Sequence, residues 1–343
     1  MTTSDPDFQL NRPGALIAAL PAVLGFVPEK SFVLVTSDRG ELGCIMRVDL
    51  STDLRDAVGH LAEVAAAARP DGAIGIVVDA DGAGCRLCND DYQHLRRALS
   101  DALDEYAIEL TDFHVVDTVG PGGRWHSADG SWGTVDDPAA SPLAMAAVLD
   151  GRRLYARREE LLDVIDVTDE DASAALAEVI RGHADEDTDT DAVRDIRGAM
   201  AAAARVTAGE TLPDDEVARL ARALLDPEIR DVLYALAVGD QAADAESLWA
   251  ALSRRLPPPW RVEALVLLAF SAYARGDGPL AGVSLEAALR CDGTHRMAGM
   301  LDSALQSGMR PEQIRDLAAT GYRLARRLGL ELPRPRDFGR RAG

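Results

Sequence analysis

The stretch RPGALIAALPAVLGFVPEKSFVLVTSDRGELGCIMRVDL, residues 12–50, decides how this chain folds. Pro13 suits the first turn of a helix, because the N–H that proline lacks has no helical partner there. Apolar side chains then recur at helical spacing as far as Leu24, and Gly25 is suited to end the helix. The first element is therefore predicted to be a helix with one face in the core.

The second half of this stretch predicts two paired strands. Pro28 disfavours helix at the residue before it, so residues 31–36 should continue as a nearly continuous apolar strand. Residues 42–49 have the composition of its hairpin partner, and residues 38–40 form the polar turn between them. The stretch specifies a packed α/β nucleus but contains no nucleophile–base pair and no complete set of metal ligands.

Helices and strands continue to alternate beyond this nucleus. The expected elements are a helix over 53–69, a strand over 73–79, a helix over 90–106, a strand over 112–119 and a short hairpin over 123–127 and 131–135. Alternation of this kind is typical of a layered domain. Residues 10–150 are therefore predicted to form an α+β or α/β domain with a mixed sheet of at least four strands.

The carboxyl-terminal half is predicted to be all helical, because no convincing strand follows residue 143. Residues 265–288 match the alternation of small and large side chains in a tetratricopeptide helix pair, whose repeat is about 34 residues long. Only this unit fits well, so residues 201–320 are expected to form a bundle of tetratricopeptide-like helix pairs that presents a groove.

Residues 151–200 are predicted to be a helical, acidic connector between the two domains. Its acidic stretch, residues 163–195 with DEDTDTD at 185–191 in the centre, is interpreted as a solvated linker or a loop that joins helices. A calcium-binding loop is the alternative, but no register supplies the glycine and the final glutamate that such a loop requires.

The charge of the chain limits its partners. A formal net charge of -21 disfavours a protein whose whole surface coats nucleic acid or an anionic membrane. The exception is an arginine-rich tail over 321–343, interpreted as a last helix followed by a solvated end. Binding of nucleic acid or of an acidic partner by this tail is the alternative.

The amino terminus and the apolar runs indicate a cytoplasmic protein without a membrane segment. MTTSDPDFQL, residues 1–10, lacks the basic region that precedes the apolar core of a secretory signal. The longest apolar run, residues 15–27, is too short to span a bilayer. In a cytoplasmic chain the four cysteines are expected to be free thiols.

The shortest motif with chemical meaning is Cys85-Arg86-Leu87-Cys88. Two thiolates at this spacing can share a zinc ion or cycle as a redox pair. Further zinc ligands would have to come from Cys44, His60 and His94, which follow no recognised spacing, and a redox pair should open a helix directly. The favoured interpretation is ordinary cysteines, with no metal and no cofactor.

Other motifs favour structure over catalysis. Residues 120–123, Gly-Pro-Gly-Gly, precede a strand and are interpreted as a turn and not as an anion-binding loop. His126 and Ser127 are adjacent in a strand and so point to opposite faces. Arg47 and Asp49 share a strand face and form a structural ion pair or, alternatively, the polar end of a pocket. No residue is therefore assigned a catalytic role, and enzymatic activity is not expected, although it is not excluded.

Several segments in combination resemble a known family. They are LGFVPEKSFVLV at 24–35, RVDL at 47–50, GRWHS at 123–127, GRRLYARREEL at 151–161 and ALVLLAFSAYARGDGPLAGVSLEAAL at 264–289. From about residue 10 to residue 310 the chain resembles an actinobacterial family, domain of unknown function 4192. The resemblance implies a cytoplasmic protein with no assigned activity. Cysteines that relatives carry shortly after the Arg-Trp-x-Ser segment are absent here.

Six residues of these family segments are candidates for one ligand-binding surface. They are Ser31, Arg47, Asp49, Arg124, Trp125 and Ser127.

Two functions follow from these observations. The first is a non-catalytic interaction or adaptor protein that binds a protein partner through its helical half. The alternative is a binding protein or an enzyme that takes a small molecule or nucleotide at the polar end of its sheet.

Overall fold

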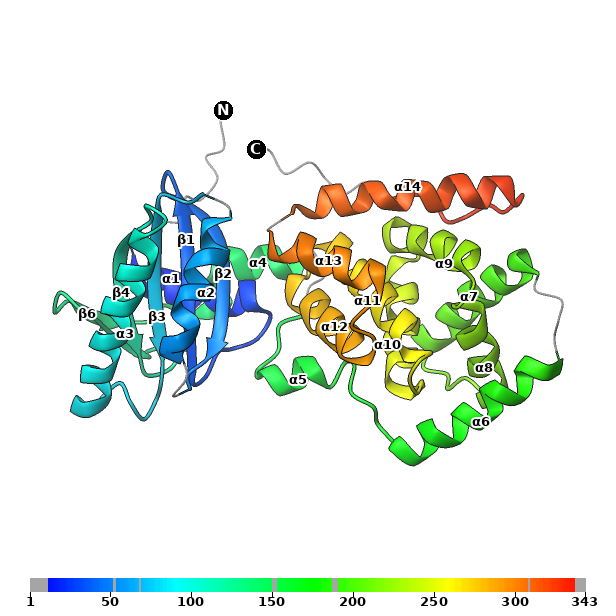
Figure 1. The fold of residues 1–343 in the computed structure, drawn as a ribbon, viewed down its shortest axis with the longest axis horizontal. Helices are drawn as coiled ribbons and strands as arrows, with labels where there is room; N and C mark the ends of the chain where they lie inside the picture. Colours follow the sequence, from blue (N-terminus) through cyan, green and yellow to red (C-terminus); the bar gives the residue numbers. More distant parts are fainter. Residues whose placement is uncertain are drawn as a thin grey trace. The chain divides into compact units, whose positions relative to one another are not determined.

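The computed structural model describes residues 12–51, 54–67, 69–149, 153–186, 191–307 and 309–336. The chain divides into two compact units (Figure 1). Unit 1 comprises Met1–Leu161 with Gln306–Gly308, and unit 2 comprises Leu162–Leu305 with Met309–Gly343. The division falls inside the segment predicted to be a connector.

Unit 1 is built on a mixed sheet of six strands. Its elements are α1 (Pro13–Leu24), β1 (Ser31–Asp38), β2 (Glu41–Asp49), α2 (Leu54–Ala66), β3 (Gly72–Val78), α3 (Arg86–Asp104), β4 (Glu109–Val116), β5 (Arg124–Ser127), β6 (Trp132–Thr134), the 3-10 turn η1 (Pro138–Ala140) and α4 (Pro142–Leu149). The strands lie in the order β2-β1-β3-β4-β5-β6, with β3 and β4 parallel and the other neighbours antiparallel. The predicted mixed sheet is confirmed.

Helix α1 begins and ends where its sequence predicts. Gly25 adopts a left-handed conformation with φ 77°, and its N–H donates to the carbonyl of Pro21 at 2.9 Å. Most residues of α1 are buried, on more than the single face that its spacing predicts, because β2, η1 and α4 all pack against it. Figure 1 shows α1 behind the sheet and α2 and α3 in front.

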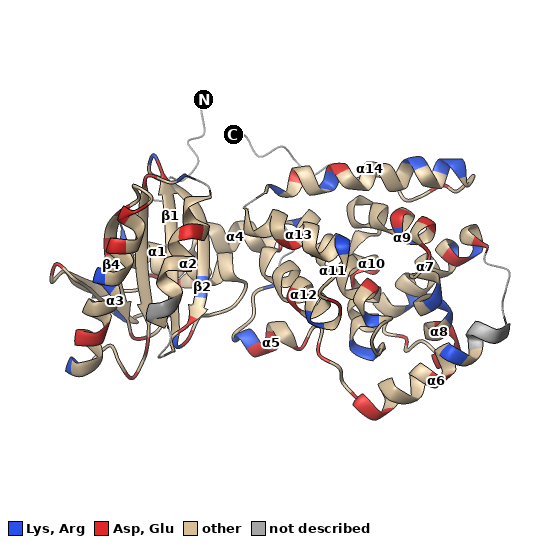
Figure 2. Cartoon of the chain, in the orientation of Figure 1, with Lys and Arg blue, Asp and Glu red and all other residues tan. Residues whose placement is uncertain are grey.

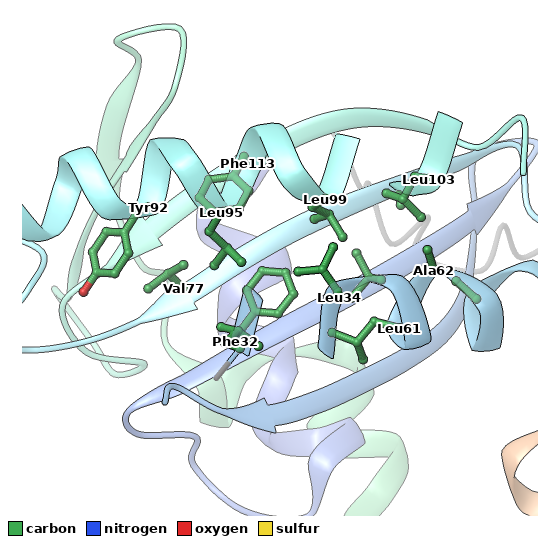
Figure 3. Close-up of a cluster of buried hydrophobic side chains, with 14 of the residues drawn as sticks. Phe32, Leu34, Leu61, Ala62, Val77, Tyr92, Leu95, Leu99, Leu103 and Phe113 are labelled. Carbon is green, nitrogen blue, oxygen red and sulfur yellow. The ribbon is translucent and has the colours of Figure 1, made fainter. Parts of the chain in front are cut away.

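The main core of unit 1 lies between the sheet and helices α2 and α3 (Figure 3). Phe32 of β1 and Phe113 of β4 stack with their ring centroids 6.2 Å apart. Leu61 of α2 and Leu99 of α3 belong to the same buried cluster. Complete burial of one such side chain contributes about 1.5–3 kcal/mol, so this cluster holds both helices on the sheet.

One end of the sheet combines the start of β1 with the ends of β2, β3 and β4. Ser31 at the start of β1 pairs with Asp49 of β2 and with Val78 of β3. Val78 pairs in turn with Val116, because β3 and β4 run in parallel. We refer to this end, with the segments that adjoin it, as the polar end of the sheet.

Most of unit 2 is a helical bundle around one central helix. Its elements are α6 (Glu170–Glu186), α7 (Ala192–Thr207), α8 (Asp214–Ala223), α9 (Pro227–Leu233), the 3-10 turn η2 (Tyr234–Val238), α10 (Ala242–Arg255), α11 (Arg261–Arg275), α12 (Gly278–Cys291), α13 (Arg296–Gln306) and α14 (Pro311–Arg327); α5 (Arg158–Leu162) spans the division between the units. Every residue of α11 from Val262 to Ala274 is buried, because α10, α12, α14 and η2 surround it. The helix pair expected over 265–288 is present as α11 and α12, whereas a tetratricopeptide-like repeat stays a prediction.

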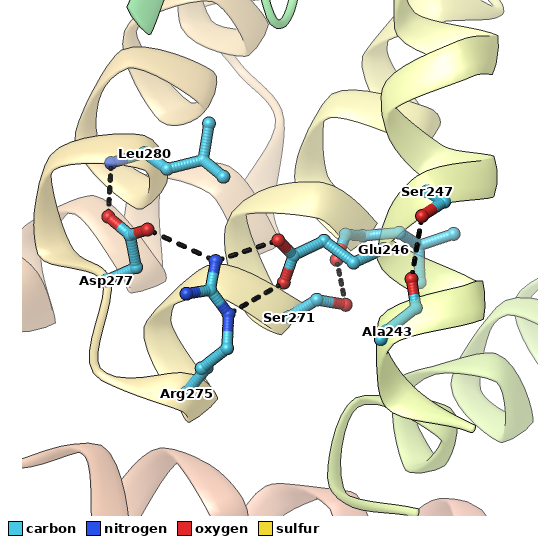
Figure 4. Close-up of polar contacts among 8 residues, drawn as sticks. Ala243, Glu246, Ser247, Ser271, Arg275, Asp277 and Leu280 are labelled. Atoms are coloured by element: carbon cyan, nitrogen blue, oxygen red, sulfur yellow. Dashed lines mark hydrogen bonds and ion pairs between the residues drawn. The ribbon is translucent and has the colours of Figure 1, made fainter. Parts of the chain in front are cut away.

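A partly buried arginine, Arg275, joins three helices of this bundle (Figure 4). Arg275, at the end of α11, donates from Nε and Nη2 to the two carboxylate oxygens of Glu246 on α10, at 3.1 and 2.8 Å. Its Nη2 also donates to Asp277 Oδ2 at 3.1 Å, and Asp277 Oδ1 accepts from the N–H of Leu280 in the first turn of α12. The turn between α11 and α12 is therefore fixed by side chains as well as by Gly276, which has φ 89°.

The segment predicted to be a helical connector contains α6 and the start of α7, and these helices extend through most of its acidic stretch. Glu170–Glu186 is the helix α6 and packs against α8, and α7 begins at Ala192, so the expectation of a linker or loop is wrong for residues 170–186 and 192–195. Leu176, Ala177 and Ile180 are buried at helical spacing and carry this packing. Residues 187–190, the rest of the acidic centre, lie outside the described residues.

The arginine-rich tail is in part a packed helix. α14 runs to Arg327, packs against α9, α11 and η2, and carries both signs of charge along its length (Figure 2). The chain after it is held back on the bundle, because Tyr322 Oη donates to the carbonyl of Pro333 at 2.8 Å. The tail's last seven residues, 337–343, lie outside the described residues. Among the helices of the described ranges, none has the length and apolar character needed to cross a membrane.

Candidate ligand-binding site at the polar end of the sheet

Asp79 directly follows β3 and is the centre of a cluster of polar side chains. Its side chain is buried, and its N–H donates to the carbonyl of Val116 at the end of β4, at 3.0 Å. Lys30 Nζ lies 2.6 Å from Asp79 Oδ1, and the Tyr92 hydroxyl donates to Asp79 Oδ2 at 2.6 Å. With Asp81, whose carboxylate lies 2.8 Å from Lys30 Nζ, these residues form what we name the Asp79 cluster.

The loop after β3 is shaped to fit around the Asp79 carboxylate. The N–H of Asp81 donates to Asp79 Oδ1 at 3.1 Å. A Cβ on Gly82 would lie 2.0 Å from Tyr92 Oη and 2.4 Å from Asp79 Oδ2, so only glycine fits at this position. The glycine is therefore required by the cluster itself.

The surroundings of Asp79 keep its carboxylate ionised. Burial acts to raise its pKa, but hydrogen bonds from Lys30, Tyr92 and the N–H of Gly82 outweigh it and lower the pKa below its usual range. Hydrogen bonds to Asp79 and then Asp81 raise the pKa of Lys30, and burial, followed by its bond to Asp79, raises that of Tyr92. At neutral pH the cluster thus holds a charged lysine, the ionised Asp79 and a protonated phenol.

Lys30, the one lysine of the chain, is held in an unusual conformation. Its φ of 42° lies in the left-handed region, which costs a residue with a side chain about 1–2 kcal/mol. Its carbonyl accepts from the N–H of Leu50 at 2.8 Å, which ties it to the end of β2. Its side chain is 55% exposed, so the ammonium group stays open to solvent while it bridges two carboxylates.

Three of the candidate residues from the sequence come together at the same end of the sheet. Arg47 Nε donates to Ser31 Oγ at 2.8 Å, and Arg47 Nη2 lies 2.6 Å from Asp49 Oδ1. The Arg47 guanidinium also lies over the ring of Phe26, 5.8 Å from its centroid. The Arg47–Asp49 ion pair is thus present, with the arginine 13% exposed and the carboxylate 75% exposed.

These three residues face the opposite side of the sheet from the Asp79 cluster. Phe32 belongs to the core under α2 and α3, so its neighbour Ser31 points to the other face, together with Arg47. Asp79 instead bonds Tyr92 of α3. One ligand therefore reaches both groups only across the end of the sheet.

The other three candidate residues do not join either group. Arg124 is 83% exposed and pairs with Asp117, whose Oδ1 accepts from the N–H groups of Thr118 and Arg124 at 2.7 Å. Trp125 Nε1 donates to the carbonyl of Thr134 at 3.2 Å. These contacts fix the turn after β4 and the β5–β6 hairpin, in agreement with the predicted turn.

Ser127 bonds a histidine that the sequence did not indicate. Its Oγ lies 2.5 Å from His114 Nδ1, and His114 Nε2 lies 3.7 Å from Asp112 Oδ2. His126 points to the other face, as predicted, where its Nε2 lies 2.8 Å from Asn89 Oδ1. Ser127 thus contacts His114, and His114 lies near Asp112, as the serine, histidine and aspartate of a hydrolytic triad do.

Burial argues against a hydrolytic role for this set. His114 is 1% exposed and Ser127 is 7% exposed. A hollow of about 270 Å³ adjoins Asp112 and Asp129, but Ser127 does not line it. Burial lowers the pKa of His114, so the imidazole is neutral and serves as a hydrogen-bonded part of the core.

The two neighbouring cysteines lie close to the Asp79 cluster. α3 begins at Arg86, with Cys85 as its N-cap residue, four residues earlier than its sequence predicts. Asn89 explains the early start, because its side-chain amide donates to the carbonyls of Ala83 and Cys85 at 3.0 and 2.8 Å. The described residues contain no group of three or more His, Cys, Asp or Glu side chains placed to hold a metal ion.

Sequence reasoning missed the central residues of the site. Lys30, Asp79 and Tyr92 are far apart in the sequence and meet only when β1, β3 and α3 pack together. Two signals were available: Asp79 is the charged residue that ends a wholly apolar strand, and Lys30 is the sole lysine.

These features define a protein with an open mixed α/β sheet, polar at the end where its parallel strands stop, and a separate helical bundle. The model of one family, described as Domain of unknown function (DUF4192), matches residues 13–312, and the chain belongs to this family. No curated protein and no solved structure matches the chain.

Proposed function

We propose that unit 1 binds a small polar molecule at the Asp79 cluster. The observation that carries the proposal is one buried, ionised carboxylate at the end of a parallel strand, bonded by a lysine that remains half exposed. Open α/β sheets commonly bind ligands at the carboxyl ends of their parallel strands. Both β3 and β4 end here.

The charges of the cluster favour a particular ligand chemistry. Lys30 carries one positive charge, and Asp79 and Asp81 carry two negative charges, so a free anion would be repelled. The Asp81 side chain is 86% exposed and offers acceptor oxygens, and Lys30 offers a donor beside them. Hydroxyl groups suit this arrangement, so the ligand class is a polyol, a sugar or the ribose of a nucleotide.

The test is a thermal-shift screen of sugars, nucleosides and nucleotides on the whole chain. A ligand at 100 times its Kd stabilises the native state by about 2.7 kcal/mol. For a unit of this size that corresponds to a rise in Tm of roughly 5–10 °C. The Asp81→Asn variant should lose the shift, whereas Asp90→Asn, an exposed residue of α3, should keep it. A ligand shift that survives Asp81→Asn would overturn the proposal.

An adaptor role for unit 2 is the second candidate. It is supported by a hollow of about 340 Å³ between α7 and α8. The hollow is lined by Arg194, Asp195, Gly198, Glu216, Arg219, Leu220 and Ala223. An apolar floor with a charged rim suits a side chain of a partner peptide.

Partner capture with matched variants tests the adaptor role. Arg219→Glu should lose a stoichiometric partner that Arg290→Glu, an exposed residue of α12, retains. Equal capture by both variants would count against this surface. A cytoplasmic location and an actinobacterial source remain expectations, and both fit either function. Binding of nucleic acid by the arginine-rich tail also remains an expectation.

A further inference from the structure

The two cysteines of Cys85-Arg86-Leu87-Cys88 occupy the first turn of a long helix. Cys85 is the N-cap residue of α3, with φ −92° and ψ 124°, and Cys88 is the third residue of this 19-residue helix. Side chains three residues apart on a helix have Cβ atoms about 5–6 Å apart. A small adjustment brings them to the spacing of about 3.5–4.5 Å that a disulfide requires.

The backbone around the pair is held in place by hydrogen bonds. The N–H of Cys85 donates to the carbonyl of Gly82 at 2.9 Å, and its carbonyl accepts from the backbone N–H of Asn89 at 3.0 Å. The Asn89 side chain adds a second donor to the same carbonyl. The thiols are therefore presented by a fixed turn.

The two sulfurs differ in their electrostatic surroundings. The N–H of Cys88, the Cys88 thiol and the N–H of Leu87 favour the Cys85 thiolate and lower the pKa of Cys85, although burial and the charge of Asp79 oppose them. The contact with Cys85 raises the pKa of Cys88. Because Cys85 is the N-cap residue of α3, at the positive end of the helix dipole, it is assigned as the attacking group and Cys88 as the resolving group.

The pair is accessible to a reactant. Both cysteines are partly exposed, and Leu87 between them is 77% exposed. An apolar side chain beside the sulfurs offers a contact to a molecule that approaches the pair.

We propose that Cys85 and Cys88 form a thiol–disulfide exchange site whose co-reactant is a disulfide. The Cys85 thiolate attacks one sulfur of the disulfide, forms a mixed disulfide and releases the other sulfur as a thiolate. Cys88 then gives its proton to solvent and attacks the Cys85 sulfur, which forms the Cys85–Cys88 disulfide and releases the second thiolate. The protein dithiol loses two electrons and the co-reactant gains them. This activity goes beyond the proposed ligand binding and does not depend on it.

The first experiment equilibrates the whole chain in mixtures of reduced and oxidised glutathione, followed by alkylation and peptide mass spectrometry. We expect the Cys85–Cys88 disulfide to form, whereas Cys44 and Cys291 should stay free thiols and be recovered in alkylated form. In the Cys88→Ser variant a glutathione mixed disulfide should accumulate on Cys85. Cys85→Ser should accumulate none on Cys88, and serine is itself a good N-cap residue, so the helix is retained.

The second experiment compares rates. At neutral pH Cys85 should be alkylated on the order of tenfold faster than Cys291. The rates at which the protein reduces a peptide disulfide and oxidised glutathione are then compared. A faster reaction with the peptide, with the advantage lost in Leu87→Ala, would identify a protein as the co-reactant. Equal rates would identify a small disulfide. Failure to form the disulfide at any glutathione ratio, or alkylation of Cys85 no faster than of Cys291, would overturn the proposal.

Discussion

Replacement of Asp79 by asparagine tests how the polar end of the sheet is stabilised. The variant keeps the size of the side chain but removes the charge to which Tyr92 donates at 2.6 Å. A hydrogen bond to a charged group contributes about 1.5–3 kcal/mol. The pair with Lys30 adds little, because the lysine is 55% exposed. Asp79→Asn should therefore lower the free energy of unfolding of unit 1 by about 2 kcal/mol at pH 7.

The pH dependence of this loss follows from the lowered pKa of Asp79. A carboxyl group whose pKa is lower in the folded state stabilises the fold above its unfolded pKa of about 3.9. That stability disappears as the pH falls through the folded pKa. The difference between wild type and Asp79→Asn should thus be complete at pH 7 and shrink below about pH 4.

Hydrogen exchange of the buried strand β3, residues 72–78, measures unit 1 without interference from unit 2. A loss of about 2 kcal/mol corresponds to exchange roughly 30-fold faster at pH 7. Asp90→Asn, on the exposed side of α3, serves as the control and should leave the exchange unchanged. Equal protection of β3 in wild type and Asp79→Asn at pH 7, or a difference that persists unchanged in acid, would refute the reasoning.

Two further substitutions test the close packing around Gly82 and the contacts of Arg275. Gly82→Ala would place a methyl group 2.0 Å from the Tyr92 hydroxyl and should destabilise unit 1 by about 1–3 kcal/mol. The control Gly84→Ala, whose added Cβ has no atom within 4 Å, should leave the stability unchanged. Hydrogen exchange of β3 measures both variants. Arg275→Met removes the partner that two carboxylates share and should cost unit 2 about 1.5–3 kcal/mol, whereas Arg290→Met breaks only an exposed pair and should cost under about 1 kcal/mol. Urea unfolding of unit 2 compares these two variants, and equal losses would contradict the role assigned to Arg275.

Much of the fold could be predicted because local sequence patterns specify its helices and strands. The apolar spacing after Pro13 and the left-handed glycine at Gly25 set the bounds of α1 correctly. The start of α3 was missed because its cap is a cysteine, supported by the side chain of Asn89, and neither is a common signal of a helix start. The end of α6 is not predicted, because the acidic composition near residue 185 favours a solvated loop where the chain is still helical.

The candidate site could be predicted only in part. Arg47 and Asp49 lie two residues apart on one strand, so alternation alone predicts that they share a face. The contact of Ser127 with His114 depends on the register of β4 against β5, and no local pattern sets that register. Lys30, Asp79 and Tyr92 are joined by the packing of three separate elements, which lies beyond any pattern of spacing.

The most direct test of the central claim locates a ligand on the chain. Hydrogen exchange would be measured with and without the sugar or nucleotide that gives the largest thermal shift. Binding at the Asp79 cluster predicts added protection over residues 79–92, which include the loop after β3 and the start of α3. Unchanged exchange in that segment, with new protection confined to the helices of unit 2, would contradict the account.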